Sequence, residues 1–208
     1  MNITRQEIID RVKTCMEELT PQWEGTAEQT EGIKIDRYID SVIEEQLRIL
    51  LLSAPIKILP VTELKEIVSV QSDKNGSGKI SLPDNFLRPV LLQMQGWEHP
   101  TTEFIDNSHP LYQLQFNQYT RGGIAKPVAA WCVDNEGDNI IEYFSLPASY
   151  TEHKIKTLLS ILSPDNGAST YDLHPLLIDM LSYRCAACVY DIMGNHPMAE
   201  ILSARCVL

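Results

Sequence analysis

Residues 79–97 read KISLPDNFLRPVLLQMQGW, and residues 98–131 continue EHPTTEFIDNSHPLYQLQFNQYTRGGIAKPVAAW. The first part holds a short apolar segment that closes on Leu-Pro-Asp and a second apolar run that ends at Gly-Trp. The second part is rich in Gln, Asn and Tyr and runs into Thr-Arg-Gly-Gly. The stretch offers no nucleophile paired with a base, no cluster of metal ligands and no phosphate-binding loop. It favours a scaffold that presents polar and aromatic surface to another protein.

Composition favours a soluble, acidic globular chain. Its 208 residues are enough for one domain with a buried core, and they carry 28 Asp and Glu against 17 Lys and Arg. The Lys and Arg are scattered, which argues against a duplex-binding surface, and a negative wall would repel DNA. An odd count of five cysteines predicts no disulfide framework. No apolar run is long enough for a membrane span, and the start lacks the plan of a signal peptide, so we expect folding in a cytoplasm.

Two amphipathic helices are predicted within residues 1–55. Thr4 and Glu7 have capping-box spacing, and Ile3 and Ile8 stand where a hydrophobic staple packs. Asp36 is a candidate cap for the second helix. The first apolar stripe is Ile8, Val12, Cys15 or Met16, and Leu19, ending at Pro21; the second is Ile39, Val42, Ile43, Gln46, Leu47 and Leu50, ending at Pro55. With an acidic loop over residues 23–32, this predicts a helical hairpin.

The period then changes to that of strands, so residues 56–162 form a predicted β-rich middle. Residues 153–162 fit a strand or a short helix equally well. Two hairpins are predicted, with strands at 66–70 and 79–82 around the turn 72–78, and strands at 128–133 and 139–144 around the turn 134–138.

An apolar helix is predicted over residues 175–193, with Gly194 as its stop and a further short helix over 198–207. Residues 172–208 are therefore a C-terminal helical segment. Helices, then strands, then helices indicate the α+β class, and we expect residues 1–208 to form a single domain.

Cys185 and Cys188, with His196 and Cys206, could be written as a four-ligand zinc site. Both members of the pair, however, fall on the stripe of the last helix, and a redox pair usually sits at a helix N-terminus. The favoured interpretation is core packing.

Three other patterns have an ordinary interpretation. Gly76-Ser77-Gly78-Lys79 lacks the first Gly and the final Ser or Thr of a phosphate-binding loop and predicts a hairpin turn. Asp134, Glu136 and Asp138 alternate like calcium ligands, but Gly137 is misplaced for an EF-hand; a solvated turn is favoured, with a weak surface ion site left open. The five histidines are dispersed and form no catalytic motif. We predict no catalytic residue, cofactor or metal.

Residues 113–127 are a candidate docking segment, with a mobile surface loop as an equal alternative. Paired glycines at 122 and 123 permit backbone shapes closed to other residues, and Tyr and Arg are favoured interface anchors. The candidate partner-binding residues are Tyr112, Gln115, Asn117, Tyr119, Arg121 and Lys126.

LPDNFLRPVLLQMQGW and NSHPLYQLQFNQYTRGGIAKPVAAW, followed by DLHPLLIDMLSYRCAACVYDIMGNHPMAEIL, resemble the head–tail connector proteins of tailed phages, also called adaptor, ring or gatekeeper proteins. The pattern is most similar to the ring proteins of short-tailed, crAss-like gut phages. The resemblance implies no catalysis. It implies a ring of copies, commonly a dodecamer, at the portal vertex of the virion, formed in the host cytoplasm. Its partners would be the portal protein, tail or further ring proteins, and DNA that passes without specific binding; no membrane is implied.

Two alternatives stay open. The first is an enzyme, hydrolase-like or nucleotide-handling, whose site is built from scattered residues. The second is a non-viral interaction module, such as a host adaptor that binds one partner without ring symmetry.

Overall fold

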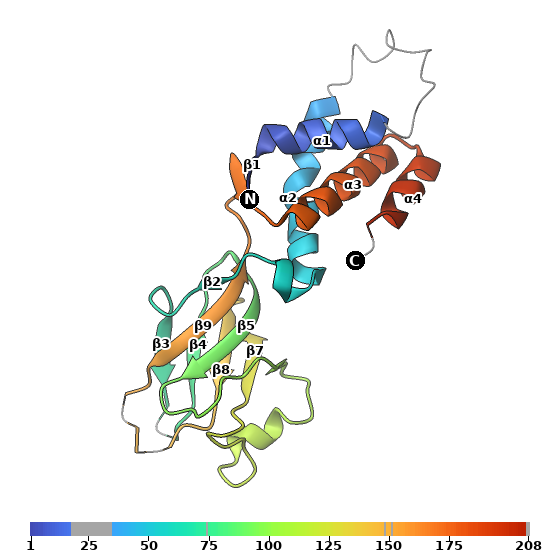
Figure 1. Ribbon diagram of the computed structural model, residues 1–208. Helices are drawn as coiled ribbons and strands as arrows, with labels where there is room; N and C mark the ends of the chain where they lie inside the picture. Colours follow the sequence, from blue (N-terminus) through green and yellow to red (C-terminus); the bar gives the residue numbers. More distant parts are fainter. Residues whose placement is uncertain (18–34, 74, 148, 151, 207–208) are drawn as a thin grey trace. The chain divides into compact units, whose positions relative to one another are not determined.

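The computed structural model describes residues 1–17, 35–73, 75–147, 149–150 and 152–206 (Figure 1). These residues form four α-helices and ten β-strands, so the predicted α+β class is confirmed. They divide into two compact units, a helical unit of residues 1–60 and 164–208 and a β unit of residues 61–163. That the whole chain acts as one domain stays a prediction.

In the helical unit, α3 is the helix on which the others pack. It contacts α1, α2 and α4, whereas α1 and α2 contact each other much less (Figure 1). The predicted stripe of α3 is Leu177, Leu181, Cys185, Cys188 and Ile192. Its first three members are fully buried, whereas Cys188 is half-buried and Ile192, at the end of the helix, is 51% exposed. The bounds are α1 Arg5–Glu17, α2 Ile35–Ser53, α3 Pro175–Ile192 and α4 His196–Ala204, with a 3-10 turn at Ile56–Ile58.

The capping box predicted for α1 is present. The backbone N–H of Thr4 donates to Glu7 Oε2 at 2.8 Å, and the backbone N–H of Glu7 donates to Thr4 Oγ1 at 3.2 Å. Ile3 and Ile8 are both buried, as a hydrophobic staple requires. The residues before the helix also pair as a strand, β1 (Asn2–Thr4), with β10 (Thr170–Asp172), an antiparallel ladder that was not predicted.

The predicted stripe of α2 is buried except for Gln46, but the predicted cap of this helix is wrong. Asp36 lies inside the first turn of α2, and its carboxylate pairs with Lys13 Nζ at 2.6 Å. The ion pair with Lys13 of α1 therefore occupies the Asp36 carboxylate, which in a helix cap would accept a backbone N–H. The predicted residues Leu19 and Pro21 and the loop at 23–32 lie outside the described residues.

The β unit contains two sheets (Figure 1). The first has the order β2-β9-β5 and is antiparallel; the second has the order β3-β4-β8-β7-β6, in which only the β6–β7 pair is parallel. The bounds are β2 Thr62–Glu63, β3 Ser69–Ser72, β4 Gly78–Ser81, β5 Phe86–Met94, β6 Phe104–Ile105, β7 Ala129–Val133, β8 Asn139–Tyr143 and β9 Ile155–Leu162.

Both predicted hairpins are present, as β3–β4 and β7–β8, but the first strand runs over Ser69–Ser72 and not over 66–70, because residues 65–67 form a turn. Their turns contain Gly76 at φ +76° and Gly137 at φ +97°, a left-handed backbone that favours glycine. The undecided segment is strand β9, because it pairs along most of its length with β5. Side chains from both sheets meet in one core, among them Leu92, Met94, Ile141, Tyr143 and Leu158.

Among the described residues, no helix combines the length and the apolar character needed to cross a membrane.

Candidate functional site

The segment that precedes β7 lies against the side of the second sheet that faces away from the core. Along β8, Ile141 and Tyr143 belong to the core, so Glu142 faces the other way. Tyr112 reaches this outer face, where its hydroxyl donates to Glu142 Oε2 at 2.6 Å, and Glu142 also pairs with Lys79 Nζ at 3.3 Å. Burial, and then this bond to a carboxylate, raise the pKa of Tyr112, so the hydroxyl stays a donor. One end of the segment is thereby fixed to the sheet.

Three aromatic rings anchor the same segment. Tyr112 and Phe116 lie on Phe144, with ring centroids 6.5 and 5.7 Å from it, and their own centroids are 5.2 Å apart. All three contacts are edge-on, the geometry in which aromatic pairs add stability beyond buried area. Phe144 is buried and directly follows β8, so the rings connect the segment to the sheet.

Gln115 acts as an internal clamp. It lies in the short 3-10 helix Gln113–Phe116 and is only 3% exposed. Its Nε2 donates to the carbonyl oxygen of Leu111 at 3.0 Å, and its Oε1 accepts from the backbone N–H of Gly122 at 3.0 Å. The side chain of Gln115 thus links Leu111, before the loop, to Gly122, near its end.

The tip of the loop is held by further bonds. Asn117 Oδ1 accepts from the backbone N–H of Tyr119 at 2.9 Å, and Arg121 Nη1 donates to the carbonyl oxygen of Asn75 in the β3–β4 turn. A Cβ on Gly122 would lie 2.7 Å from the carbonyl oxygen of Lys126, so the turn of the chain at this point requires glycine. The loop therefore has a defined shape before any partner binds.

This restrained loop exposes large apolar side chains. Phe116 is 62% exposed and Tyr119 is 87% exposed, and Leu111 and Leu114 are exposed beside them. A hollow of about 440 Å³ lies at the tip between Asn75, Phe116, Asn117, Gln118, Tyr119 and Arg121. We call Leu111, Leu114, Phe116, Tyr119, Arg121 and Lys126 the loop surface.

The charge of the loop surface differs from that of the chain. Residues 107–133 contain no Asp or Glu, although the whole chain carries 28 of them and a net charge of −11. The same stretch contains one Arg and one Lys, which are Arg121 and Lys126. The loop surface is thus a cationic, apolar area on an acidic protein.

The six predicted partner-binding residues take two different places. Tyr112 and Gln115 are half-buried and buried, so they position the loop and do not form its outer surface. Asn117, Tyr119 and Lys126 are exposed and Arg121 is half-buried at the hollow. Sequence reasoning missed Leu111, Leu114 and Phe116, although apolar residues within a polar segment were a usable signal.

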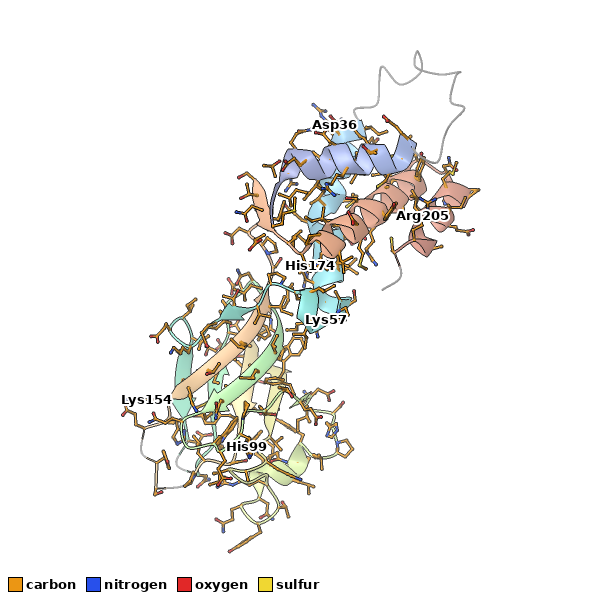
Figure 2. The ribbon with its side chains drawn as sticks, viewed as in Figure 1. Asp36, Lys57, His99, Lys154, His174 and Arg205 are labelled. Atoms are coloured by element: carbon orange, nitrogen blue, oxygen red, sulfur yellow. The ribbon has the colours of Figure 1, made fainter. Side chains whose placement is uncertain are left out.

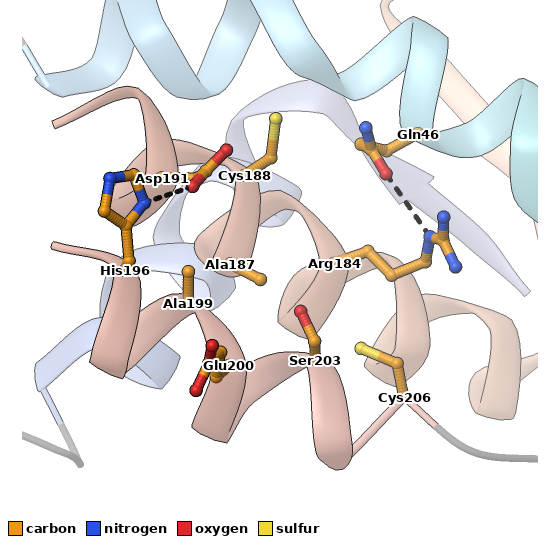
Figure 3. Close-up of a pocket in the computed structure, with 10 residues that line it drawn as sticks. All are labelled: Gln46, Arg184, Ala187, Cys188, Asp191, His196, Ala199, Glu200, Ser203 and Cys206. Atoms are coloured by element: carbon orange, nitrogen blue, oxygen red, sulfur yellow. Dashed lines mark hydrogen bonds and ion pairs between the residues drawn. The ribbon is translucent and has the colours of Figure 1, made fainter. Parts of the chain in front are cut away.

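The cysteine and histidine residues are not brought together as a zinc site. Cys188, His196 and Cys206 line a cavity of about 640 Å³ between α2, α3 and α4 (Figure 3), while Cys185 is buried beside them on α3. His196 Nδ1 lies 2.6 Å from Asp191 Oδ1. In the part of the chain that the structure describes, three or more ligand atoms lie within 4.8 Å of one another only at Asp134, Glu136 and Asp138.

The thiols are also poorly suited to redox chemistry. Burial raises the pKa of Cys185 to about 12 and raises that of Cys188 as well. Both therefore stay protonated near neutral pH, and the thiolate is the reactive form. Cys185 packs in the core as predicted, whereas Cys188 is half-buried at the cavity.

The acidic turn and the other motifs have structural partners. Asp134 Oδ1 accepts from the backbone N–H groups of Glu136 at 2.8 Å and Asp138 at 3.0 Å, and the bond from Asp138 is the main reason that its pKa is lowered. These bonds explain the turn without an ion. The histidines are dispersed: His99 lies in the β unit and His174 caps α3 in the helical unit (Figure 2).

No family model matches the chain, and no curated protein matches it either.

Proposed function

We propose that the protein is a structural component of the portal vertex of a tailed phage. Copies of the chain form a ring, twelve by the resemblance, that joins the portal protein to the tail or to further ring proteins and surrounds the DNA channel. In this proposal the helical pair, the β-rich middle and the C-terminal helices form one connector architecture. The protein assembles in the host cytoplasm and remains in the neck of the virion.

The observation that carries the proposal is the loop surface. Phe116 and Tyr119 are large side chains exposed to water by a loop that is already held by its own bonds and by bonds to the rest of the β unit. Exposing such groups together has a cost in solubility, and apolar areas of this kind mark interaction sites. A loop that is ordered beforehand also loses less entropy when it binds. A docking role accounts for both features.

The charge of the chain supports the channel role. With a net charge of −11 and few cations gathered in one place, the protein would form a wall that repels the phosphate backbone. DNA could then move through the ring without being retained.

The test is co-sedimentation with the portal protein. Tyr119→Ala with Arg121→Ala removes the exposed ring, one cation and the bond from Arg121 to the Asn75 carbonyl, while the clamp of Gln115 is kept. The matched control is Tyr38→Ala with Arg37→Ala, an exposed Tyr and Arg pair on α2. We expect the loop variant to fold, because surface changes rarely cost much stability, and to lose portal binding.

The control should fold and bind as the wild type does. A loop variant that folds and binds the portal normally would remove the loop from the interface. If instead the wild-type chain stays apart from the portal and turns over a substrate, the enzyme alternative replaces the connector. Binding of one host partner without ring symmetry would favour an interaction module.

A further inference from the structure

The loop surface and the acidic turn lie at opposite ends of the same sheet. Strand β7 starts at Ala129, directly after the loop, and ends at Val133, directly before the turn at residues 134–138. Arg121 donates to the carbonyl oxygen of Asn75 in the β3–β4 turn. Gly78, at the start of β4, pairs with Tyr143, and Tyr143 pairs with Ala129 at the start of β7. The β3–β4 turn is therefore at the same end of the sheet as the loop. Five strand residues separate the two surfaces by roughly 15 Å, so they cannot meet within one copy.

The loop surface and the acidic turn have opposite charge, and each has an exposed apolar side chain beside it. The turn carries Asp134, Glu136 and Asp138 with no Lys or Arg among residues 134–138, and its carboxylate oxygens lie within 4.8 Å of one another. Carboxylates this close repel each other, and a cation beside them relieves the repulsion. Lys79 of the same copy is near enough to act on Asp134, but its ammonium group forms an ion pair with Glu142. Val133, next to the turn, is 59% exposed and offers an apolar contact. The loop surface supplies the cations and the apolar rings.

We propose that the loop surface of one copy docks on the acidic turn of a second copy, so that β units join head to tail. This inference rests on the proposed function and names a neighbouring copy as the partner of its docking surface; the loop variant then loses portal binding because the ring that seats on the portal does not form. Lys126 and Arg121 face Glu136 and Asp138 of the neighbour, and Tyr119 packs beside the neighbour's Val133.

The arrangement has a consequence for symmetry. Two different surfaces of one chain are used, so the contact is heterologous, and repetition gives a closed ring or an open filament. A two-fold dimer would instead need one surface that pairs with itself. Because the loop surface is cationic and most of the chain is acidic, a second copy is a suitable occupant on charge alone.

The experiment is sedimentation velocity of the full-length chain over a range of concentrations, with EDTA present. The loop variant is Tyr119→Ala with Lys126→Ala, and the turn variant is Glu136→Lys with Asp138→Lys. None of these four side chains holds its own loop or turn by a bond that the structure describes; the turn is held by Asp134. The control, Glu66→Lys with Asp84→Lys, makes the same change of charge at exposed sites elsewhere in the β unit.

We expect the wild type and the control to form species larger than a dimer, and each of the two variants alone to sediment as a monomer. An equimolar mixture of the loop and turn variants retains one intact pair of surfaces, so it should stop at a heterodimer. Higher salt should weaken every one of these contacts, because exposed charges are screened.

The contrary outcomes are distinct. If the wild type assembles and the variants assemble equally well, the head-to-tail contact is wrong, while the ring can still form through another surface. Assembly that requires added calcium would assign the acidic turn to an ion and overturn the contact. A wild type that stays monomeric alone also overturns it, and the connector function is then decided separately by binding to the portal.

Discussion

Replacing Gln115 tests whether the loop surface is held in shape from within. Gln115→Ala removes two hydrogen bonds, those to the Leu111 carbonyl and from the Gly122 N–H, each worth about 1 kcal/mol. It also removes a buried methylene group, worth about 0.8 kcal/mol. We therefore expect the local free energy of opening of the loop to fall by about 2–3 kcal/mol.

The assay is hydrogen exchange at the backbone N–H of Arg121, which donates to the carbonyl oxygen of Asn117 at 3.0 Å. The substitution leaves this bond in place, so its exchange reports opening of the loop separately from unfolding of either unit. A loss of 2–3 kcal/mol corresponds to exchange that is faster by about 30- to 150-fold. Gln113→Ala is the matched control, because Gln113 lies in the same 3-10 helix with its side chain exposed. Its exchange rate should stay within about 3-fold of the wild type, as for an ordinary surface change.

The reasoning fails if Gln115→Ala and Gln113→Ala give the same exchange rate at the Arg121 N–H. The loop would then be shaped by the aromatic contacts alone. If exchange rises as expected, portal binding by Gln115→Ala should also weaken, since a loosened loop must be ordered again on binding.

Four further predictions follow from other parts of the molecule. Ser145 has φ +79° and a buried hydroxyl without a hydrogen-bond partner among the described residues. Ser145→Gly should therefore raise the free energy of unfolding by about 1–2 kcal/mol, seen as a higher midpoint of chemical unfolding. The hydrogen bond from Arg5 lowers the pKa of Glu44, so the ionised carboxylate stabilises the helical unit. This stability is lost as the pH falls through the lowered pKa. In an acid titration followed by circular dichroism, Glu44→Gln should therefore lose less stability than the wild type does. Cys185→Ala should cost about 1–3 kcal/mol in thermal or chemical unfolding and more than Cys188→Ala, with elemental analysis finding no stoichiometric zinc in either protein. Duplex DNA should bind weakly or not at all in a mobility-shift titration at physiological salt, and micromolar binding would contradict the channel role.

Local signals in the sequence predicted local structure well. The capping box of Thr4 and Glu7 depends on residues three apart, and the β3–β4 and β7–β8 hairpins depend on turns that contain Gly76 and Gly137. In each case the residues that determine the element are its own neighbours. The α+β class follows from such elements and could be predicted.

Contacts between distant residues could not be predicted in the same way. The β1–β10 ladder joins the two ends of the sequence through strands of only three residues, too short for an alternating pattern. Asp36 had the right residue type for a cap, but Lys13 of another helix pairs with it. Strand β9 was ambiguous by its pattern, and pairing with β5 decides it.

The same difference applies to the candidate site. The residue types of Tyr119 and Arg121 were enough to suggest a surface that binds a partner. The inward direction of Gln115 was not predictable, since an amide in a polar segment gives no sign that it will meet the Gly122 N–H. The exposure of Phe116 likewise depends on which of its faces packs on Phe144, a contact made by the fold.

Electron microscopy of the full-length protein, alone and mixed with the portal protein, tests the connector function most directly. We expect closed rings, or collars seated on the portal, in class averages of the wild type, and their loss with Tyr119→Ala and Arg121→Ala. Portals without a collar beside a protein that stays monodisperse and monomeric would contradict it.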